Sequence, residues 1–449
     1  MSTPMDLALN QALSEHRACL ERMALANLGN DAKRPKAWAE YGYKSELCFD
    51  DFHRMYKRGG VAHGVVNRLT EKCWETDPWI VQGDEFDDKR PETPWEADLR
   101  RMFKRLKVWR AFMDGDRRRL VGHYSGLLLQ IADGKQWGAP YIPGRGDLVR
   151  IIPAWEGQLQ PTAWDENPAS PTYGDVAMWD YQEARVRQND STSPPRAVSI
   201  HPSRVVILGD VREGEPFLEA GFNDFVNLEK ILGGSGESFL KNATRQMSVE
   251  FDKDVDLTRI AQAHGVPVAE LADLFNQQAR DINAGLDALM ITQGGAVKTL
   301  VASVPDPEPH FGIAVQSAAA SVRIPAKIIV GMQTGERAST EDIRDFNKRG
   351  QGRRINTLTG DIETFVSHLT RLRLLPPAPG GEFTVVWDDL TESSQSEKLD
   401  AAAKMAEINA KSLGGGQPVP FSSEEIRDTA GFDNDDPLAP MGEDVEDGF

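Results

Sequence analysis

A single apolar pattern with helical spacing runs from about residue 339 to residue 375, and any fold of this chain has to accommodate it. Ser339 is the expected N-cap, and Asp342 occupies the third helical position of a capping-box-like start. The apolar side chains recur at three- and four-residue steps: Ile343, Phe346, Ile355, Leu358, Ile362, Phe365, Val366, Leu369 and Leu372. Because more than thirty residues is long for a helix of a globular protein, we predict a kink near Gly350 or Gly352.

Helical patterns also lie on both sides of a central β-rich stretch. Residues 149–208 are rich in Pro, Gly and Trp and carry short β-type runs at 149–152 and 205–208, and a further strand is expected at 383–387. Helical spacing is present at residues 5–23, 49–73, 95–129, 221–247, 266–284, 310–323, 396–413 and 422–429. This order of elements predicts an α+β fold.

Glycine-bearing segments give two further local predictions. Residues 287–292 and 297–302 flank a Gln-Gly-Gly turn and are expected to pair as a β-hairpin. Three glycines lie within the helical pattern at 221–247: Gly233, Gly234 and Gly236. Since each glycine costs a helix about 1 kcal/mol relative to Ala, we expect either a helix break there or the close approach of another backbone.

Length and cysteine content limit the protein class. A chain of 449 residues suggests two to four structural units or one large irregular one, with enough core to need no disulfide or metal. Its cysteines are Cys19, Cys48 and Cys73, which have no C-x-x-C spacing and suit a reducing compartment. No apolar stretch approaches the roughly 18 residues of a membrane span. We expect a soluble protein with no membrane partner.

Net charge argues against a tight, sequence-independent DNA binder. The chain carries 51 Lys and Arg against 69 Asp and Glu, so 51 − 69 = −18, whereas such binders are usually basic. Residues 433–449 carry seven acidic residues and no basic one, which is typical of a solvated tail. An electrostatic function of this tail is the alternative interpretation.

One strongly basic stretch, at residues 100–119, contrasts with this acidity. Its helical pattern places apolar residues on one face and cations on the other, and it ends in Arg117, Arg118 and Arg119. We interpret the basic face as solvated surface or as an interface with an acidic neighbour, with DNA contact as the alternative. Arg117, Arg118 and Arg119 are therefore candidate interface residues.

Signatures of nucleotide binding and nucleophilic catalysis are close to absent. The GGSGE sequence at 233–237 lacks the Lys of a phosphate loop and a preceding strand, and it does not complete G-x-S-x-G. Ser238 and Lys241 fit S-x-x-K only as a chance match without companion motifs. We expect no catalytic residue and no cofactor.

Metal-binding patterns are equally weak. The eight histidines are scattered, and Asp388 and Asp389 are more simply read as surface charge. His201 begins the turn HPSR, which enters a strand and ends at Arg204. We interpret it as a structural turn in which Arg204 could pair with an acidic helix start, with ligand contact as the alternative.

Three sequence stretches together resemble the portal proteins of tailed bacteriophages, over about residues 46–432. They are IHPSRVVILGD at 200–210, IPAKIIVGMQTGERASTEDIRDFNKRGQGRR at 324–354 and FSSEEIRDTAGF at 421–432. The first resembles the stretch before the first stem helix, and the second resembles the end of the second stem helix, the tunnel loop and the long kinked helix. The third resembles a small crown element.

This resemblance implies a portal-like fold with a mixed α/β wing, a helical stem, a small α/β clip and a helical crown. It divides the chain into an N-terminal segment (1–45), wing (46–220 and 339–392), stem helices (221–245 and 307–323), clip (246–306), tunnel loop (324–338), crown (393–432) and acidic tail (433–449). The clip is short, and the glycines of the first stem helix depart from the usual pattern of that helix.

The resemblance also implies residue roles in the tunnel loop. Met332, Gln333 and Thr334 would face DNA with uncharged side chains, while Glu336 and Arg337 would pair between neighbouring subunits and hold the loops in register. Glycines in this segment allow it to shift without unfolding its flanks.

The function implied is a structural ring of about twelve copies at one capsid vertex, which serves as the channel for DNA packaging and ejection. Implied partners are further copies of the chain, the terminase large subunit, the major capsid protein and a scaffold protein, a head-tail adaptor, and double-stranded DNA passing through without tight binding. The protein would be located in the virion, and in the host cytoplasm during assembly. The alternatives are a virion structural protein without a channel, or a hydrolase with an unrecognised site.

Overall fold

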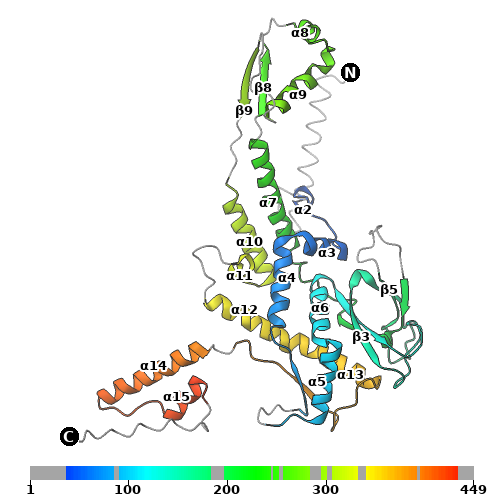
Figure 1. The fold of residues 1–449 in the computed structure, drawn as a ribbon, viewed down its shortest axis with the longest axis vertical. Coiled ribbons are helices and arrows are strands. Elements are labelled where there is room, and N and C mark those ends of the chain that lie inside the picture. The colour runs from blue at the N-terminus through cyan, green and yellow to red at the C-terminus, as the bar shows by residue number, and fades with distance from the viewer. Residues whose placement is uncertain are drawn as a thin grey trace, which may run out of the picture.

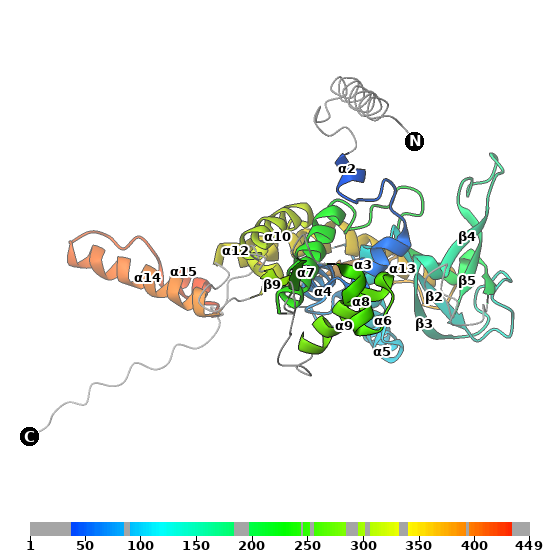
Figure 2. The ribbon, with the colours of Figure 1, turned by 90° about the horizontal axis from the view of Figure 1, so that it is seen from above.

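The computed structural model describes residues 37–84, 90–183, 197–243, 246–251, 256–283, 295–300, 306–331, 340–391 and 395–432. Figure 1 shows a mixed helical and sheet body from which two helices, α7 and α10, rise together toward a small unit containing β8, β9, α8 and α9. A helical hairpin, α14–α15, projects from the other end and stands apart from the body in both views (Figures 1 and 2). The molecule is therefore elongated, and its ends contain different elements.

Four successive helices form the helical part of the body, and all four were predicted. They are α3 (Phe49–Arg58), α4 (Gly60–Cys73), α5 (Pro94–Leu106) and α6 (Val108–Val121), preceded by the short α2 (Ala37–Glu40). α5 begins with a capping box in which the Thr93 hydroxyl accepts from the Glu96 amide and the Glu96 carboxylate accepts from the Thr93 amide. It ends at Lys107, whose left-handed φ of 53° separates α5 from α6.

Two antiparallel three-stranded sheets complete the body, with orders β3-β2-β7 and β4-β5-β6. Their strands are β2 (Tyr124–Ile131), β3 (Leu148–Trp155), β4 (Leu159–Trp164), β5 (Val176–Gln182), β6 (Ala197–Ile200) and β7 (Val205–Gly209). The expected strands at 149–152 and 205–208 are confirmed. The helical pattern that runs to residue 129 was wrong at its end, because Leu127, Leu128 and Leu129 are fully buried in the central strand β2.

The core of the body joins helices from both halves of the chain. Phe112 of α6 and Phe103 of α5 both meet Phe365 edge-on, with ring centroids 5.0 and 6.2 Å apart. A second, smaller core lies between the two sheets and includes Leu128, Leu159 and Ile200, all fully buried. Aromatic rings and branched side chains thus fix the long C-terminal helix against the N-terminal helices.

The long helix predicted at 339–375 comprises α12 (Thr340–Arg353) and α13 (Thr359–Arg371), joined by a π-helical segment, Arg354–Leu358. The irregularity expected near Gly350 or Gly352 is therefore present, but it begins just after Gly352. π-helical turns are an established cause of bends in long helices. The Ser339 cap lies outside the described residues.

The α7–α10 pair consists of α7 (Phe222–Ala243) and α10 (Glu308–Val322), which pack against each other. α7 continues through its three glycines, so the expected break was wrong. A Cβ added at any of the three would meet nothing within 4 Å, so no other backbone packs close to them within the described part of the chain. The glycines therefore leave an open strip along α7.

Beyond this pair lie β8 (Gln246–Phe251), α8 (Leu257–His264), α9 (Leu271–Asn283) and β9 (Gly295–Leu300). The expected hairpin partner at 287–292 lies outside the described residues, and the strand that pairs with β9 is β8. Their antiparallel register aligns Val249 with Val297. The helix expected at 266–284 begins only at Leu271, and α8 was not predicted.

The remaining elements close the body and form the projecting hairpin. β10 (Phe383–Val386), predicted at 383–387, pairs with β1 (Trp79–Gln82), and α11 (Ala326–Val330) follows α10. The hairpin consists of α14 (Gln395–Gly414) and α15 (Ser423–Ala430), close to their expected positions. Asn409 holds the hairpin together, because its side chain donates to the Phe421 carbonyl at 2.8 Å and accepts from the Phe421 amide.

Candidate functional site

The tunnel-loop candidates Met332, Gln333, Thr334, Glu336 and Arg337 lie outside the described residues. The two ends of this segment are joined to α11 and α12, which are both described. Both of these flanks are fixed in the body.

The first flank, α11, is anchored by burial. Ile324, just before α11, and Ile329 within it are both buried in the main core, and α11 packs against α4. Gly331 follows α11 with a φ of 84°, a left-handed conformation that L side chains rarely adopt. The helix α11 therefore ends at a defined residue, Gly331.

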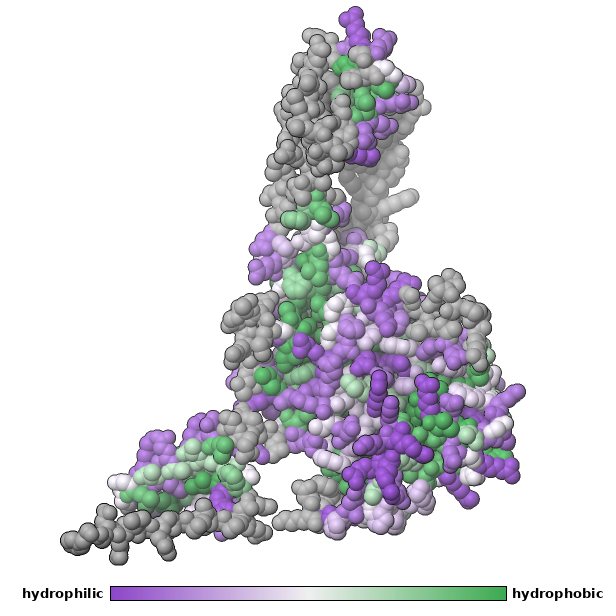
Figure 3. All heavy atoms as spheres, viewed as in Figure 1, coloured by the Kyte–Doolittle hydropathy of each residue, from purple (hydrophilic) through white to green (hydrophobic). Residues whose placement is uncertain are grey.

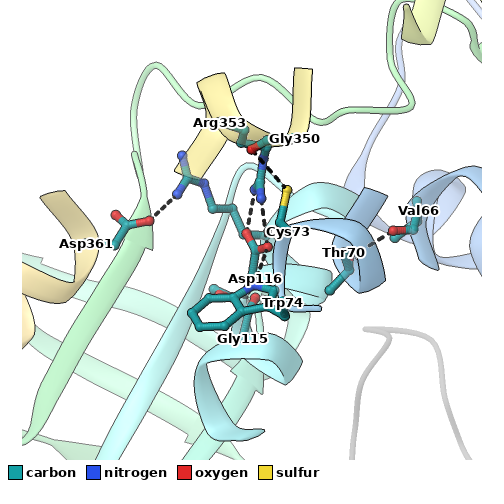
Figure 4. A network of polar contacts seen from close by, with 11 residues as sticks. Val66, Thr70, Cys73, Trp74, Gly115, Asp116, Gly350, Arg353 and Asp361 are labelled. Atoms are coloured by element: carbon teal, nitrogen blue, oxygen red, sulfur yellow. Dashed lines mark hydrogen bonds and ion pairs between the residues drawn. The ribbon is translucent and has the colours of Figure 1, made fainter. Parts of the chain in front are cut away.

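The second flank, α12, is anchored by a buried ion pair at its C-terminal end. Arg353 forms a two-pronged pair with Asp116 of α6, with N–O distances of 2.8 and 2.5 Å. Asp116 also accepts a 3.0 Å hydrogen bond from the indole nitrogen of Trp74 (Figure 4). Asp116 is almost fully buried, so three hydrogen bonds replace the water that its carboxylate loses.

The charges of this pair stabilise each other. Burial alone would raise the pKa of Asp116, but the positive charge of Arg353 and the hydrogen bonds from Arg353 and Trp74 hold it below its ordinary value. The same pairing outweighs burial at Arg353 and raises its pKa. Both groups are therefore charged at neutral pH, and removal of either would leave the other as an uncompensated buried charge.

The next residue, Arg354, fixes the start of the π-helical segment. Its fully buried guanidinium donates to the Cys73 carbonyl at 2.8 Å, to the Asp388 carbonyl at 2.9 Å and to the Thr76 hydroxyl at 3.3 Å. It also lies 4.9 Å from the ring centroid of Trp387. Arg354 thus joins the long helix to the end of α4 and to the strand region of β10.

A second ion pair connects α6 with α13 beside the first. Arg119 donates to Asp361 at 2.5 Å, and burial raises the pKa of Asp361 to about 6, with the nearby negative charge of Asp116 adding to the shift. A cleft of about 570 Å³ lies alongside and includes Arg119, Arg353 and Asp361 in its lining. Its remaining polar lining includes His123, whose pKa is raised chiefly by the hydrogen bond with Glu156.

The three candidate interface arginines make contacts within their own chain. Arg117 pairs with Asp114 at 2.8 Å, and Arg119 pairs with Asp361. The guanidinium of Arg118 lies 5.4 Å from the ring centroid of Trp155, and burial lowers its pKa. These contacts give the arginines a structural role in the body, and their role at a subunit interface stays a prediction.

The α7–α10 pair has a different surface, because large apolar side chains point into solvent. Phe239 and Leu240 of α7 are 71% and 66% exposed, and Ile313 of α10 is 68% exposed. Figure 3 shows hydrophobic atoms along this pair. A groove of about 570 Å³ between the two helices is lined in part by small residues, among them Gly234 and Ser235. Exposed apolar side chains beside such a groove are typical of an interaction surface.

The buried ionic residues were missed by the sequence analysis, although a signal was present. Asp116 falls at a four-residue step from Phe112 and Leu120, on the buried row of α6. A charged carboxylate on such a row needs a cation or several hydrogen-bond donors beside it. The sequence does not show which arginine supplies it, because Arg353 lies more than two hundred residues away.

The HPSR turn has the structural role expected of it, but the partner of Arg204 differs from the expected acidic helix start. Arg204 is fully buried and pairs with Asp133 at 2.5 Å, in the turn after β2 rather than at a helix start. Across the described part of the chain, no group of three or more His, Cys, Asp or Glu side chains is placed to hold a metal ion. Among the described helices, none combines the length and hydropathy needed to cross a membrane.

Comparison with known proteins decides the family. A family model described as phage portal protein matches residues 51–411, which is most of the chain. The chain belongs to the phage portal protein family. Members of this family are structural proteins, and this portal protein is not an enzyme. The matched region includes both flanks of the tunnel-loop segment and the α7–α10 pair.

Solved structures and curated proteins give less support to the family assignment than the family model does. A chain from the neck of a native GTA particle is 12% identical, with a TM-score of 0.45, covering 85% of this portal protein and 94% of that chain. An HK97-family phage portal protein from Corynebacterium diphtheriae is 11% identical, with a TM-score of 0.37, covering 75% and 93%. No curated protein matches. The family assignment therefore rests on the family model.

Proposed function

We propose that this portal protein assembles into a ring of about twelve copies at one capsid vertex and forms the channel for DNA packaging and ejection. The observation that carries the proposal is the exposed apolar surface of the α7–α10 pair in a chain of this family. Within the described part of one chain, Phe239, Leu240 and Ile313 lie in solvent, whereas a closed ring would bury the same surface in every copy. Interfaces of this kind are extensive and of the obligate class.

The proposed division of the chain follows the elements. The body corresponds to the wing (46–220 and 339–392), α7 and α10 to the stem helices (221–245 and 307–323), and β8, α8, α9 and β9 to the clip (246–306). The α14–α15 hairpin corresponds to the crown (393–432). In this arrangement the tunnel loop (324–338) begins with α11, which packs against α4, and it is followed by α12, which the Arg353–Asp116 pair holds to α6.

Within the tunnel loop, Met332, Gln333 and Thr334 would present uncharged side chains to DNA. Such side chains contact a sliding duplex without forming lasting ion pairs with its phosphates. Glu336 and Arg337 would pair between neighbouring subunits. Met332→Ala or Thr334→Ala should leave the ring intact and change DNA packaging or retention, while Glu336→Ala should loosen the constriction.

The proposed partners follow from the position of the ring. The outer body would contact the major capsid protein and a scaffold protein, and the ring would be the docking platform for the terminase large subunit and a head-tail adaptor. The protein would reside at the capsid vertex of the virion, after assembly in the host cytoplasm. No cofactor is required for any of these roles.

The experiment that tests the proposal is imaging of the purified chain by mass photometry and electron microscopy. We expect rings of about twelve copies, with the tunnel loop at the narrowest point. A protein that remains monomeric at all concentrations, or a ring with Met332, Gln333 and Thr334 on its outer wall, would contradict the proposal.

Deletion of 287–302 tests the clip, because loss of ring formation is expected if this segment contacts a neighbour.

A further inference from the structure

A basic surface covers α5 and the first turn of α6, and none of the proposed functions involves it. The opposite face of α5 is apolar and buried through Leu99 and Phe103, so the cations point outward. We call them the α5 basic surface: Arg100, Arg101, Lys104, Arg105, Lys107 and Arg110, all exposed. Figure 3 shows hydrophilic side chains gathered over this part of the body.

Most of this surface is not neutralised by the body itself. Arg100 pairs with Glu92 at 2.7 Å, and Arg101 pairs with Asp98 of its own helix. The other four cations form no ion pair or hydrogen bond through their side chains with any residue that the structure describes: Lys104, Arg105, Lys107 and Arg110. Four cations without an anionic partner among the described residues thus lie within seven residues, in a chain with a net charge of −18.

We propose that the α5 basic surface binds the acidic segment 433–449 of the same chain. That segment carries seven carboxylates and no cation, so its charge complements the surface. The two existing pairs, Arg100–Glu92 and Arg101–Asp98, show that cations of this surface already bind carboxylates. Acidic blocks of this kind often serve as interaction tails.

The position of the segment supports binding within one chain. It begins directly after α15, and Figure 1 places both α15 and α5 at the end of the molecule remote from β8 and β9. Seventeen residues span at most about 60 Å when extended. Because the segment is covalently attached, its effective concentration at a reachable surface is high, whereas an external ligand has to be captured from solution.

Double-stranded DNA is the less favoured occupant. DNA affinity of this type depends on many phosphate contacts made by Lys and Arg, and this surface offers four unpaired cations on a molecule that is negative overall. A bound acidic segment would neutralise these cations and keep the surface from holding DNA. The inference does not depend on ring formation, because the contact is tested within a single chain.

The test is zero-length carbodiimide cross-linking of the full-length protein, which joins a lysine amine to a nearby carboxylate, followed by mass spectrometry. At about 50 mM salt we expect cross-links from Lys104 or Lys107 to carboxylates of 433–449, in a product that migrates as a single chain. The yield should fall roughly fivefold or more at about 0.5 M salt, because exposed charges are then screened. The exposed lysines Lys135 and Lys348 serve as internal controls and should cross-link far less.

A matched pair of variants separates local from overall charge. Arg105→Gln with Arg110→Gln keeps both reactive lysines but should lower the cross-link yield roughly fivefold. Lys135→Gln with Lys348→Gln removes the same charge elsewhere and should leave the yield unchanged. Equal yields at all exposed lysines, no effect of salt, or a cross-linked dimer would overturn the proposal. DNA binding that requires Arg105 and Arg110, without any cross-link to 433–449, would assign the surface to DNA instead.

Discussion

The body and the α7–α10 pair use the same kinds of residue in opposite ways. In the body, Phe112 and Phe365 are buried within a core that also encloses charged pairs, whereas Phe239 and Leu240 of α7 lie in solvent. The body therefore buries its core within the described part of one chain, while the α7–α10 pair exposes apolar surface that none of the described residues covers. This difference predicts that substitutions in the body change folding, and that substitutions on the exposed pair change assembly.

The largest effect on folding is expected from the buried ion pair. Asp116→Ala should lower the free energy of unfolding by about 3–5 kcal/mol, because Arg353 would be left as a buried charge without a partner. Guanidinium unfolding followed by tryptophan fluorescence measures this. Arg101→Ala, in the exposed pair with Asp98, is the control and should change stability by no more than about 1 kcal/mol. Equal losses in the free energy of unfolding for the two substitutions would contradict the expectation that a buried ion pair contributes more to stability than an exposed one.

A pH-dependent effect is expected at Asp361, which is 19% exposed. Its folded pKa of about 6 lies above the ordinary 3.8, so its contribution to stability is present below about pH 4 and is lost as pH rises through 6. The loss amounts to at most about 3 kcal/mol. Asp361→Asn removes this titration, so the stability of the variant relative to the wild type should improve between about pH 4 and about pH 7.5. A relative stability that is independent of pH would show that Asp361 titrates normally.

Substitution by Ala should have opposite effects on stability at two glycines, one just before α7 and one within it. At Gly221, a Cβ would lie 2.1 Å from the Ser321 hydroxyl oxygen, so Gly221→Ala should force α7 away from α10 and cost about 1–3 kcal/mol. At Gly234 nothing lies within 4 Å, so Gly234→Ala should stabilise the isolated helix by up to about 1 kcal/mol. Thermal unfolding of the α7–α10 region measures both. A loss of stability in Gly234→Ala as a monomer would contradict the open strip along α7.

The smallest effect on folding is expected on the exposed face itself. Phe239→Ser should change the free energy of unfolding of the chain by about 0.5 kcal/mol or less, because the side chain is already largely in water. Ring formation, measured by mass photometry, should nevertheless be impaired. Phe365→Ser, the matched substitution in the body's core, should lower the free energy of unfolding by about 3–5 kcal/mol, as much as the loss of the buried ion pair. Normal ring formation by Phe239→Ser would place the subunit interface elsewhere.

Periodic patterns predicted the helices well, and pairings over long distances in the sequence were not predictable. α3, α5 and α13 follow from apolar spacing, since each buries one face. The helical pattern at 95–129 wrongly included Leu127, which lies in a strand. A fully buried strand is as apolar as a buried helix, so apolar spacing alone does not distinguish the two. Strand β9 was located correctly and its expected partner at 287–292 lies outside the described residues, whereas its pairing with β8, about fifty residues earlier, was not predicted.

The same limit applies to the candidate site. The resemblance to portal proteins located the tunnel-loop candidates in the sequence. It did not identify the arginines that fix the second flank of that segment, α12. Arg353 and Arg354 belong to a polar run, and nothing in that run shows that one reaches Asp116 and the other the Cys73 carbonyl. Local sequence encodes a helix and its faces, whereas a buried charge pair depends on where two distant helices cross.

The π-helical segment Arg354–Leu358 lies between α12 and α13. A π turn holds about one residue more than an α turn, and one residue corresponds to about 100° of rotation around an α-helix. Because the wide turn completes the same rotation with that extra residue, the faces of α12 and α13 keep their alignment across it. Deleting one residue between 354 and 358 should therefore restore an α-helical turn and leave the side chains of α12 close to their present directions. The same deletion inside α12 would instead rotate the residues before it by about 100° relative to α13.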